Sequence, residues 1–546
     1  MAFNPTVMQQ KAIETRGNIL VSAAAGSGKT AVLVERVINM LTDKTSPTSA
    51  DRLLIVTFTN AAAAEMRSRI EKRLFEEIQK NPNDESLQRQ KYLLQSADIC
   101  TIDSFCIKLV RENFEKCGIE PDFKISDGSS QKSLCTAVMS KLIAEYLEDP
   151  SEDFLRLLEL TNCEYDEANL TELVDRLYLY SQQLPFPEKF INELLLPYET
   201  SFSEGNIWYD MAFKIAAKHL QTAQNSAQKM SDVAPYINKN TDKHIADAEN
   251  ICGILDELLN LVGTKNWDTF AEKINTISFD RAPGSSKDDE NGALYKANRE
   301  TVKLSIKELA EIFYAVRQDV QQDISIDRNA VKLLTEIVDE YGKRLFEAFC
   351  KENSFTFYNM EQLALGLLCE YKDGEIVIRD EAKVLCNRYD EVLVDEFQDV
   401  NDLQNMLFYV LSNQEEKLFV VGDVKQSIYG FRGSNPDNFL AKKNAYIAIE
   451  NADNNDSKKI VLSDNFRSRD GVCKTVNFFF SHLMAGQCGS IVYNEEEQLN
   501  AGGTFPKSNA ATTEILAIDK YGDDTEDSLL EFESQQIAQY IISVMN

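Results

Sequence analysis

Residues 19–30 read Ile-Leu-Val-Ser-Ala-Ala-Ala-Gly-Ser-Gly-Lys-Thr, so that an apolar run passes directly into a series of small residues. Small residues let successive backbone N–H groups converge on an anion, and the stretch therefore predicts a strand, a phosphate-binding loop and a helix. Lys29 adds a mobile positive charge, and Thr30 offers a hydroxyl to Mg²⁺. Ala23 stands where such loops usually begin with glycine, so the chain must enter the loop in a conformation open to alanine. The plainer alternative is a glycine-rich helix start that binds nothing.

A second apolar run ends in acidic and amide side chains, reading Leu-Val-Asp-Glu-Phe-Gln-Asp at residues 393–399. Asp395 is suited to hold Mg²⁺ through its water shell, and Glu396 to polarise the attacking water. Taken alone, a buried strand with a solvated acidic turn would explain this run. Gln398 and Asp399, however, extend the polar series beyond what metal binding requires. Together the two stretches predict the halves of one nucleotide-hydrolysing site.

Short apolar runs followed by polar clusters recur along the chain. Strands of this kind are typical of parallel sheets that are buried on both faces. In open α/β sheets the ligands bind beyond the carboxyl ends of the strands. The pattern therefore predicts an α/β fold with a parallel sheet, whose further strands cover residues 53–56, 97–100, 392–394, 418–421 and 460–462.

Four side chains outside these two stretches are candidate nucleotide contacts. The amide of Gln9 is suited to read an adenine edge through two hydrogen bonds. Gln426 could place an amide near the terminal phosphate, and Arg467 could neutralise charge developing there, although a structural salt bridge is the alternative for Arg467. Phe466 could stack on the base or belong to the core. The loop contributes the remaining predicted contacts, which are Ala25, Gly26, Ser27 and Gly28.

An aromatic and hydroxyl-rich set of residues predicts a binding site for single-stranded nucleic acid. Aromatic faces stack on bases without regard to sequence, while hydroxyl, amide and basic groups bind phosphates. Individually such aromatics more often belong to a core. The set consists of Thr57, Phe58, Asn60, Thr101, Ser104, Tyr429, Phe431 and Arg432. Basic residues on the helix expected after Phe58 add local positive charge, and these are Arg67, Arg69, Lys72 and Arg73.

Composition limits the class of protein. With 57 basic and 88 acidic residues the net charge is −31, which argues against broad attraction to a polyanion, so that any DNA site must be assembled locally. The 11 cysteines form no Cys-x-x-Cys pair, and the 3 histidines are isolated, which disfavours structural zinc and a disulfide framework. We find neither a membrane span nor a secretory signal, and we expect a cytoplasmic protein with free thiols.

The pattern of apolar residues changes between residues 114 and 347, where they recur at the three- and four-residue spacing of helices. We expect a first α/β domain from residues 1–113 and 348–442, interrupted by a helical insertion at 114–347. An independent domain on flexible linkers is the alternative for the insertion. Residues 443–546 are expected to form part of a second α/β domain, with a strand at 514–518 and an amphipathic pattern at 530–545.

Read together, the motifs resemble those of superfamily 1A helicases of the UvrD/Rep type. The matching segments, in chain order, are Gln9 and residues 23–30, 57–60, 101–106, 393–401, 421–434 and 462–468. Within that group, residues 422–429, which read Gly-Asp-Val-Lys-Gln-Ser-Ile-Tyr, the loop and the long insertion favour the AddA/RecB branch. The resemblance implies a RecA-like P-loop motor domain, a large helical insertion and part of a second RecA-like domain.

The resemblance also implies an activity and partners. It implies a 3′-to-5′ DNA motor that uses ATP and Mg²⁺, binds single-stranded DNA and double-stranded DNA ends, and works with an AddB-like subunit in break processing for recombination. It implies base stacking by Phe58 and Phe431, adenine packing by Phe466, and γ-phosphate contacts by Gln426 and Arg467.

The sequence departs from this family in two respects. Asp103 stands where related sequences commonly have histidine, so no phosphate contact is assigned to it. We find no match to motifs V and VI or to a carboxyl-terminal nuclease, and we expect an amino-terminal fragment that binds Mg·ATP but neither unwinds processively nor cuts DNA. The alternatives are a stand-alone UvrD-like repair helicase and a non-motor DNA-binding or assembly module with a vestigial ATP site.

Overall fold

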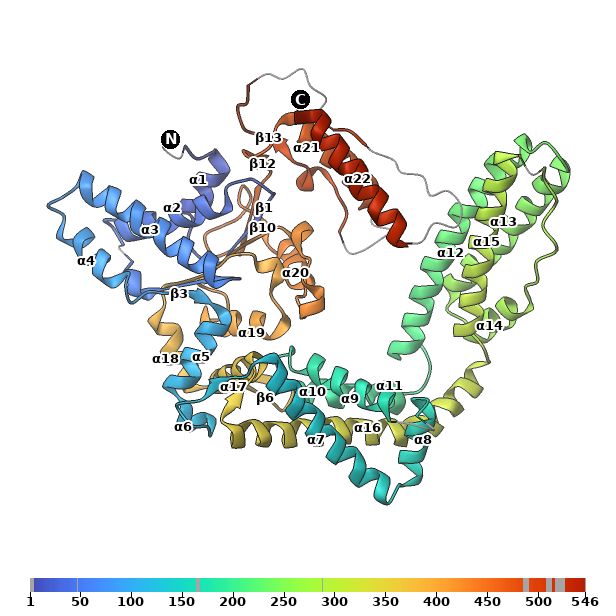
Figure 1. Ribbon diagram of the computed structural model, residues 1–546, viewed down its shortest axis with the longest axis horizontal. Helices are drawn as coiled ribbons and strands as arrows, with labels where there is room; N and C mark the ends of the chain where they lie inside the picture. Colours follow the sequence, from blue (N-terminus) through green and yellow to red (C-terminus); the bar gives the residue numbers. More distant parts are fainter. Residues whose placement is uncertain are drawn as a thin grey trace. The chain divides into compact units, whose positions relative to one another are not determined.

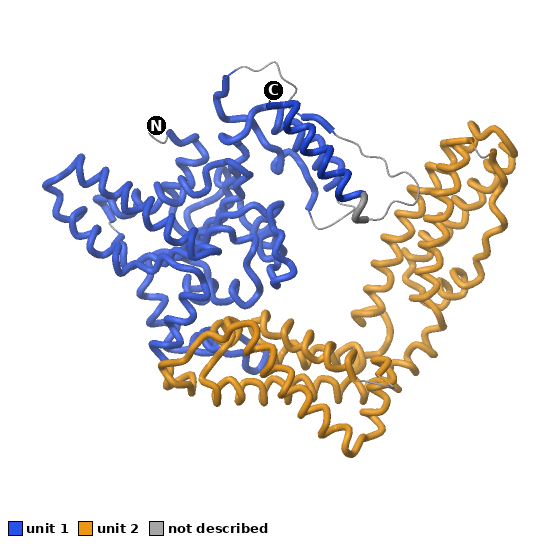
Figure 2. Tube along the Cα trace, in the orientation of Figure 1, with its two compact units in different colours: residues 1–113, 363–546 blue, residues 114–362 orange. Residues whose placement is uncertain are grey.

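The computed structural model describes residues 4–46, 48–163, 167–286, 288–484, 491–506, 513–515 and 526–545. The chain forms two compact units, which are unit 1 (residues 1–113 and 363–546) and unit 2 (residues 114–362) (Figure 2). The chain returns from unit 2 to unit 1 after residue 362, whereas the sequence suggested that the helical insertion ends at residue 347. The reason is that the long helix α16 (Arg317–Glu352) and the strand β5 (Ser354–Phe355), which pairs with β4 (Lys124–Ile125), both belong to unit 2.

Unit 1 is built around a sheet of seven strands, all paired in parallel. Its four central strands are completely buried, as expected for a sheet covered on both faces. The α/β class and the parallel sheet predicted from the apolar runs are therefore confirmed. In spatial order the strands are β10 (Ile447–Ala448), β11 (Lys458–Leu462), β1 (Ile19–Ala23), β9 (Leu418–Gly422), β8 (Glu391–Val394), β2 (Leu53–Thr57) and β3 (Asp98–Thr101).

The sheet extends further along the sequence than expected. Residues 443–546 were assigned to a second domain, yet β10 and β11 belong to this sheet. β11 pairs with β1 along its whole length, from Ile19 opposite Lys458 to Ala23 opposite Leu462. Ile460 and Leu462 are buried in the same hydrophobic cluster as β1. A strand whose apolar side chains complete this core must lie in the first sheet.

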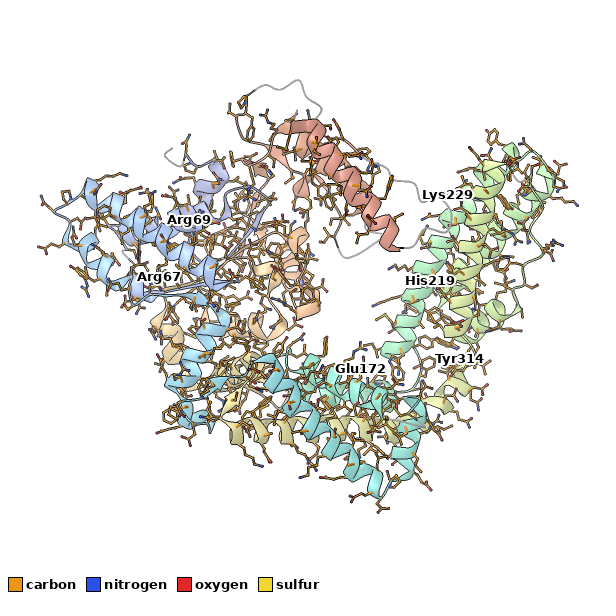
Figure 3. The ribbon with its side chains drawn as sticks, in the orientation of Figure 1. Arg67, Arg69, Glu172, His219, Lys229 and Tyr314 are labelled. Atoms are coloured by element: carbon orange, nitrogen blue, oxygen red, sulfur yellow. The ribbon has the colours of Figure 1, made fainter. Side chains whose placement is uncertain are left out.

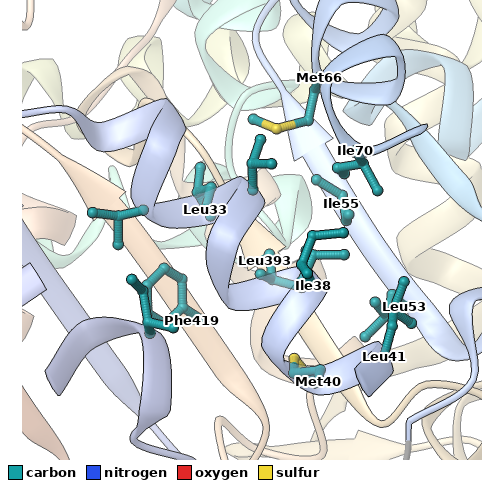
Figure 4. Packing of buried hydrophobic residues seen from close by; sticks show 14 of the residues in the cluster. Leu33, Ile38, Met40, Leu41, Leu53, Ile55, Met66, Ile70, Leu393 and Phe419 are labelled. Carbon is teal, nitrogen blue, oxygen red and sulfur yellow. The ribbon is translucent and has the colours of Figure 1, made fainter. Parts of the chain in front are cut away.

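Helices surround the sheet of unit 1 (Figure 1). Helix α2 begins at Lys29 directly after the loop, and its Leu33 and Ile38 join Ile55, Leu393 and Phe419 of the strands in one buried cluster (Figure 4). The helices of unit 1 before β11 are α1 (Val7–Glu14), α2 (Lys29–Thr42), α3 (Asn60–Lys80), α4 (Glu85–Leu93), α5 (Ile102–Glu112), α18 (Asp380–Arg388), α19 (Asp402–Leu411) and α20 (Asp437–Ala445). Helix α17 (Phe357–Leu368) begins in unit 2 and ends in unit 1. A hairpin of β6 (Cys369–Lys372) and β7 (Glu375–Ile378) precedes α18.

Beyond β11 the chain forms a smaller set of elements. Strand β12 (Asp464–Asn465) pairs in parallel with β13 (Asn500–Ala501), and between them lie α21 (Asp470–Leu483) and the short turn η6 (Glu495–Glu497). The amphipathic pattern at 530–545 lies in helix α22 (Glu526–Met545). Residues 516–518 of the strand expected at 514–518 lie outside the described residues, and residues 513–515 form no regular element.

Unit 2 is helical apart from the β4–β5 pair, within the residues described there. One buried cluster joins α12, α13 and α15 with aromatic residues such as Trp267 and Phe313. The helices are α6 (Phe114–Cys117), α7 (Gly128–Glu148), α8 (Glu152–Leu160), α9 (Ala168–Ser181), α10 (Pro187–Glu193), α11 (Leu196–Glu199), α12 (Ile207–Val233), α13 (Thr241–Thr264), α14 (Trp267–Thr276), α15 (Glu290–Ile312) and α16. Among the described helices of either unit, none combines the length and hydropathy needed to span a bilayer.

Candidate nucleotide and strand-binding site

The phosphate-binding loop predicted from the sequence lies between β1 and α2. Gly26 and Gly28 have φ values of +73° and +83°, in the left-handed region that favours glycine. A Cβ on Gly26 would also lie 2.9 Å from the Asn465 amide. Both the backbone conformation and the close approach of Asn465 therefore require glycine at this position. Ala23 is the last residue of β1, in extended backbone, which explains why alanine is accepted there.

The two sequence stretches meet at the carboxyl edge of the sheet. Lys29 Nζ donates a hydrogen bond to Glu396 Oε2 at 2.6 Å, in a partly buried ion pair. Glu396 follows β8 with a φ of +53°, an uncommon conformation for a residue with a side chain. The lysine and the glutamate predicted to act on one nucleotide are thus in direct contact, although 367 residues separate them in sequence.

A chain of hydrogen bonds continues from Glu396 to the loop after β9. Gln398 Nε2 donates to Glu396 Oε2 at 2.9 Å and to Asp399 Oδ2 at 3.1 Å, while its Oε1 accepts from the backbone N–H of Asp423 at 3.0 Å. Gln426 Nε2 in turn donates to Asp423 Oδ2 at 2.8 Å. Gln426, the candidate sensor of the terminal phosphate, is therefore joined to Glu396 through two intermediate residues, Gln398 and Asp423.

Burial shapes the electrostatics of the acidic stretch. Desolvation, and then the neighbouring charge of Glu396, raise the pKa of Asp395 to about 6. The same two causes raise the pKa of Asp399 to about 6. A buried carboxylate beside a second carboxylate is stabilised by a cation, so this environment fits a divalent metal.

Gln9 braces the loop from the amino-terminal side. It is only 3% exposed; its Nε2 donates to the Ser27 carbonyl at 2.9 Å and its Oε1 accepts from the Thr6 N–H at 2.8 Å. Both ends of the amide are therefore bonded inside the protein, and contact with an adenine edge stays a prediction. The Ser27 hydroxyl is buried without a hydrogen-bond partner among the described residues.

Asn465 is a contact that the sequence did not single out. Its Nδ2 donates to the Ala25 carbonyl at 2.8 Å, and its Oδ1 accepts from the N–H groups of Arg467 at 2.9 Å and Ser468 at 2.7 Å. The Phe466 N–H donates to the Gly26 carbonyl at 2.9 Å. These bonds place Phe466 and Arg467 against the loop, where both side chains are exposed. The guanidinium of Arg467 has no ion-pair partner within the described chain, which disfavours the structural salt bridge considered for it.

The predicted aromatic residues gather at the same edge of the sheet. Phe58 and Tyr429 are stacked with ring centroids 4.8 Å apart, and Phe431 follows at 6.0 Å from Tyr429. The Arg432 Cζ lies 5.6 Å from the rings of both Tyr429 and Phe431. Phe58 is 38% exposed and Phe431 79% exposed, so neither is a core residue.

The polar residues of this region divide into surface and buried groups. Ser104 Oγ lies 2.9 Å from Thr101 Oγ1 and donates to Asn60 Oδ1 at 3.4 Å, which forms a small polar surface beside Phe58. Thr57 and Thr101, however, are buried, and the Thr57 hydroxyl donates to the Thr59 carbonyl at 3.1 Å. The expected side-chain contact of Thr57 with a nucleic acid is therefore not supported.

The basic residues expected to attract DNA along α3 have other partners. Arg67 donates to the carbonyls of Leu94 and Ala97, at 2.7 and 2.9 Å, and Arg69 pairs with Glu65 (Figure 3). Arg73 pairs with three glutamates, Glu35, Glu76 and Glu77. Arg67, Arg69 and Arg73 therefore have partners within the protein, and the local positive charge expected along α3 stays a prediction.

A parallel sheet whose carboxyl edge carries a glycine loop, a lysine and paired carboxylates is typical of nucleotide-binding α/β proteins. The family model described as the UvrD/REP helicase N-terminal domain matches residues 6–447, and the chain belongs to this family.

The curated relatives narrow the comparison to the AddA group, as the sequence motifs predicted. The chain is 35% identical over 514 residues to the AddA subunit of the ATP-dependent helicase/nuclease from Ruminiclostridium cellulolyticum, and the match covers 91% of this chain and 40% of that protein. It is 34% identical over 531 residues to the corresponding protein of Listeria welshimeri (95% and 42%) and 33% identical over 538 residues to that of Bacillus velezensis (96% and 43%). The chain spans about two fifths of the length of these relatives.

Proposed function

We propose that this chain is the ATP-hydrolysing motor portion of an AddA-type DNA helicase that acts in double-strand-break repair. The observation that carries the proposal is the continuous series of contacts from Lys29 through Glu396 to Gln426, since these are groups suited to bind, hydrolyse and sense a nucleoside triphosphate. The sheet of unit 1 is the first motor domain, unit 2 is its helical insertion, and the elements after β11 begin a second motor domain.

The phosphates of ATP would lie on the loop, bound by its backbone N–H groups and by Lys29. Two features fit an anion there: the buried Ser27 hydroxyl without a partner among the described residues, and the exposed side chain of Arg467, whose Cβ lies close to Gly26. Phe466 lies exposed against the same loop and offers its ring to the base. Arg467 is thus a candidate to neutralise charge on the terminal phosphate.

Thr30 and Asp395 would hold Mg²⁺, and the raised pKa of Asp395 fits a buried carboxylate that is stabilised by a cation. When bound, Mg²⁺ supplies charge neutralisation of the phosphate oxygens. Glu396 orients and polarises the attacking water. Lys29 and Gln398 both donate to Glu396 Oε2, so phosphate binding to Lys29 would remove one of the two donors that hold this oxygen.

Gln426 and the aromatic residues Tyr429 and Phe431 belong to one loop after β9, three and five positions apart. A shift of Gln426 towards a terminal phosphate would move the exposed rings, on which bases of single-stranded DNA stack. This connection supports a motor rather than a passive binding module. We infer 3′-to-5′ translocation, double-stranded DNA ends as substrate and an AddB-like partner; the designation of the relatives as one subunit of a helicase/nuclease supports the partner.

The decisive experiment compares Lys29→Ala with a matched control, Lys11→Ala, whose lysine forms only an exposed pair with Glu450 at 3.5 Å. Binding of a fluorescent ATP analogue and ATP hydrolysis with and without single-stranded DNA are measured for both variants. We expect Lys29→Ala to lose affinity at least about tenfold, since a charge-assisted contact is removed, and to lose DNA-stimulated hydrolysis. Hydrolysis that does not depend on Lys29 would overturn the proposal.

A further inference from the structure

A carboxylate outside the nucleotide loop lies buried between two lysines. Glu497, in the turn η6, is 4% exposed, and its two oxygens accept separately from Lys425 and Lys443. Lys425 belongs to the turn after β9, and Lys443 to α20. Burial opposes the charge of Glu497, but Lys425 and Lys443 hold its pKa below the usual value.

The contact with Lys425 leads directly to the proposed phosphate sensor. Lys425 Nζ also lies 2.8 Å from Asp423 Oδ1, and the other oxygen of Asp423 accepts from Gln426 Nε2 at 2.8 Å. The chain of contacts therefore runs from Glu497 through Lys425 and Asp423 to Gln426. Each carboxylate in it is shared by two side chains, so the loss of one donor or acceptor changes the bonds of the next.

The segment that carries Glu497 is itself fixed in place. Leu499 exchanges two backbone hydrogen bonds with the Asn477 side chain on α21, at 2.9 and 3.0 Å. Strand β13 pairs with β12, whose Asn465 binds the Ala25 carbonyl of the phosphate loop. The elements after β11 thus contact the proposed nucleotide site at two points. Asn465 binds the loop, and Glu497 is linked to Gln426 through Lys425 and Asp423.

We propose that Glu497 is a positioning residue for hydrolysis: by holding Lys425, it keeps Asp423 available to orient the Gln426 amide towards the terminal phosphate. The inference rests on the proposed function and deepens it. Without the Glu497 charge, Lys425 is held by Asp423 alone and competes with Gln426 for that carboxylate. The effect is specific to the terminal phosphate, because the loop and Lys29, which bind the other phosphates, do not touch Glu497.

The experiment compares Glu497→Gln with Glu496→Gln in the full chain. Glu496 is the matched control, because it is the adjacent residue of the same turn, is half exposed, and forms only a 3.6 Å pair with Lys459. The affinities for ADP and for a non-hydrolysable ATP analogue are measured for both. We expect Glu497→Gln to weaken binding of the triphosphate about fivefold, the size of one hydrogen bond, with ADP affinity within about twofold of wild type. Glu496→Gln should change neither.

A second variant, Lys443→Gln, tests the proposal if Glu497→Gln does not fold. It releases Glu497 on the side away from Gln426, and we expect a smaller loss of triphosphate affinity in the same direction. Equal losses for ADP and triphosphate, or no loss in a folded Glu497→Gln protein, would overturn the positioning role. Failure of the wild-type chain to bind nucleotide in a Lys29-dependent manner would instead overturn the proposed function, so the two failures are distinguishable.

Discussion

The carboxyl edge of the sheet in unit 1 has two halves that are built on opposite principles. Around Lys29 and Glu396, charged and amide side chains are buried or partly buried and are bonded to one another at 2.6–3.1 Å. Around Tyr429, the neighbouring rings of Phe58 and Phe431 are 38% and 79% exposed. A group that must act on phosphate needs a fixed position in a low dielectric, whereas a ring that stacks on successive bases must present its face to solvent.

The largest effect is expected from Glu396→Gln, which alters the buried half alone. Loss of the base should lower the single-turnover hydrolysis rate by about 10²-fold or more. Nucleotide affinity should hold or rise, because Lys29 is freed from its ion pair, and DNA affinity should not change. Quench-flow kinetics and nucleotide titration measure the two effects, with Glu375→Gln on the exposed strand β7 as control. Unchanged hydrolysis would remove Glu396 from the mechanism.

The exposed half is tested by Phe431→Ala. Each stacked base contributes about 1–3 kcal/mol, so affinity for a labelled single-stranded oligonucleotide should fall by roughly 5- to 150-fold at constant salt. Nucleotide affinity without DNA should remain that of wild type. Phe75→Ala is the matched control, since Phe75 is a half-exposed ring on α3 outside the cluster, and Phe431→Trp should restore binding. Equal losses for Phe431→Ala and Phe75→Ala would contradict a stacking role.

The buried half should also show a distinctive pH dependence in the absence of Mg²⁺. Because the pKa of Asp395 is raised to about 6 from an ordinary value near 3.9, the folded state binds its proton more readily than the unfolded state. The ionised group therefore destabilises the fold above pH 6, and this cost disappears as the pH falls towards 4. Asp395→Asn should raise the free energy of opening of β8 relative to wild type by about 3 kcal/mol above pH 6 and by progressively less below it.

Amide hydrogen exchange along β1, β8 and β9 measures this opening at each pH. Asp373→Asn, at an exposed position after β6, serves as the control and should follow wild type throughout. A difference between Asp395→Asn and wild type that stays constant from pH 4 to pH 8 would mean that Asp395 does not titrate in this range.

The smallest effect is expected from Arg69→Ala on α3. Arg69 forms an exposed pair with Glu65, and such pairs contribute little. The affinity for single-stranded DNA should change less than about twofold, and its salt dependence should keep the same slope, because no phosphate contact is lost. Fluorescence anisotropy at several salt concentrations measures both quantities. A clear fall in the slope would show that α3 contacts DNA phosphates, and DNA binding would then not be confined to the exposed aromatic half.

The sequence predicted those parts of the molecule in which local pattern and position coincide. Parallel strands buried on both faces read as short apolar runs, and each run is followed by the residues that reach the carboxyl edge. Lys29, Glu396 and Gln426 could be found in this way. The exposed rings were identified only because they follow the same strands, since no local feature separates a surface ring from a core ring.

Contacts across long stretches of sequence could not be predicted. Asn465 binds the Ala25 carbonyl from 440 residues away. Nothing in the sequence around Asn465 indicates that its amide contacts the loop between β1 and α2. Glu497 lies in a run of acidic residues, which is normally a solvated surface. The place of β11 in the first sheet depends on its pairing with β1, and its apolar run alone does not show which sheet it joins.

The strand order has a consequence for synthesis of the chain. Strands β1 and β2 emerge early, yet β8 and β9, which lie between them, follow several hundred residues later, with Ile19 paired to Phe419. At about 5–20 residues per second, translation of the intervening chain takes roughly 20–80 s. During that interval the unpaired edges of β1 and β2 are open to wrong partners. We therefore expect folding of the nascent chain to be helped by chaperones that cover these edges until β8 and β9 are made.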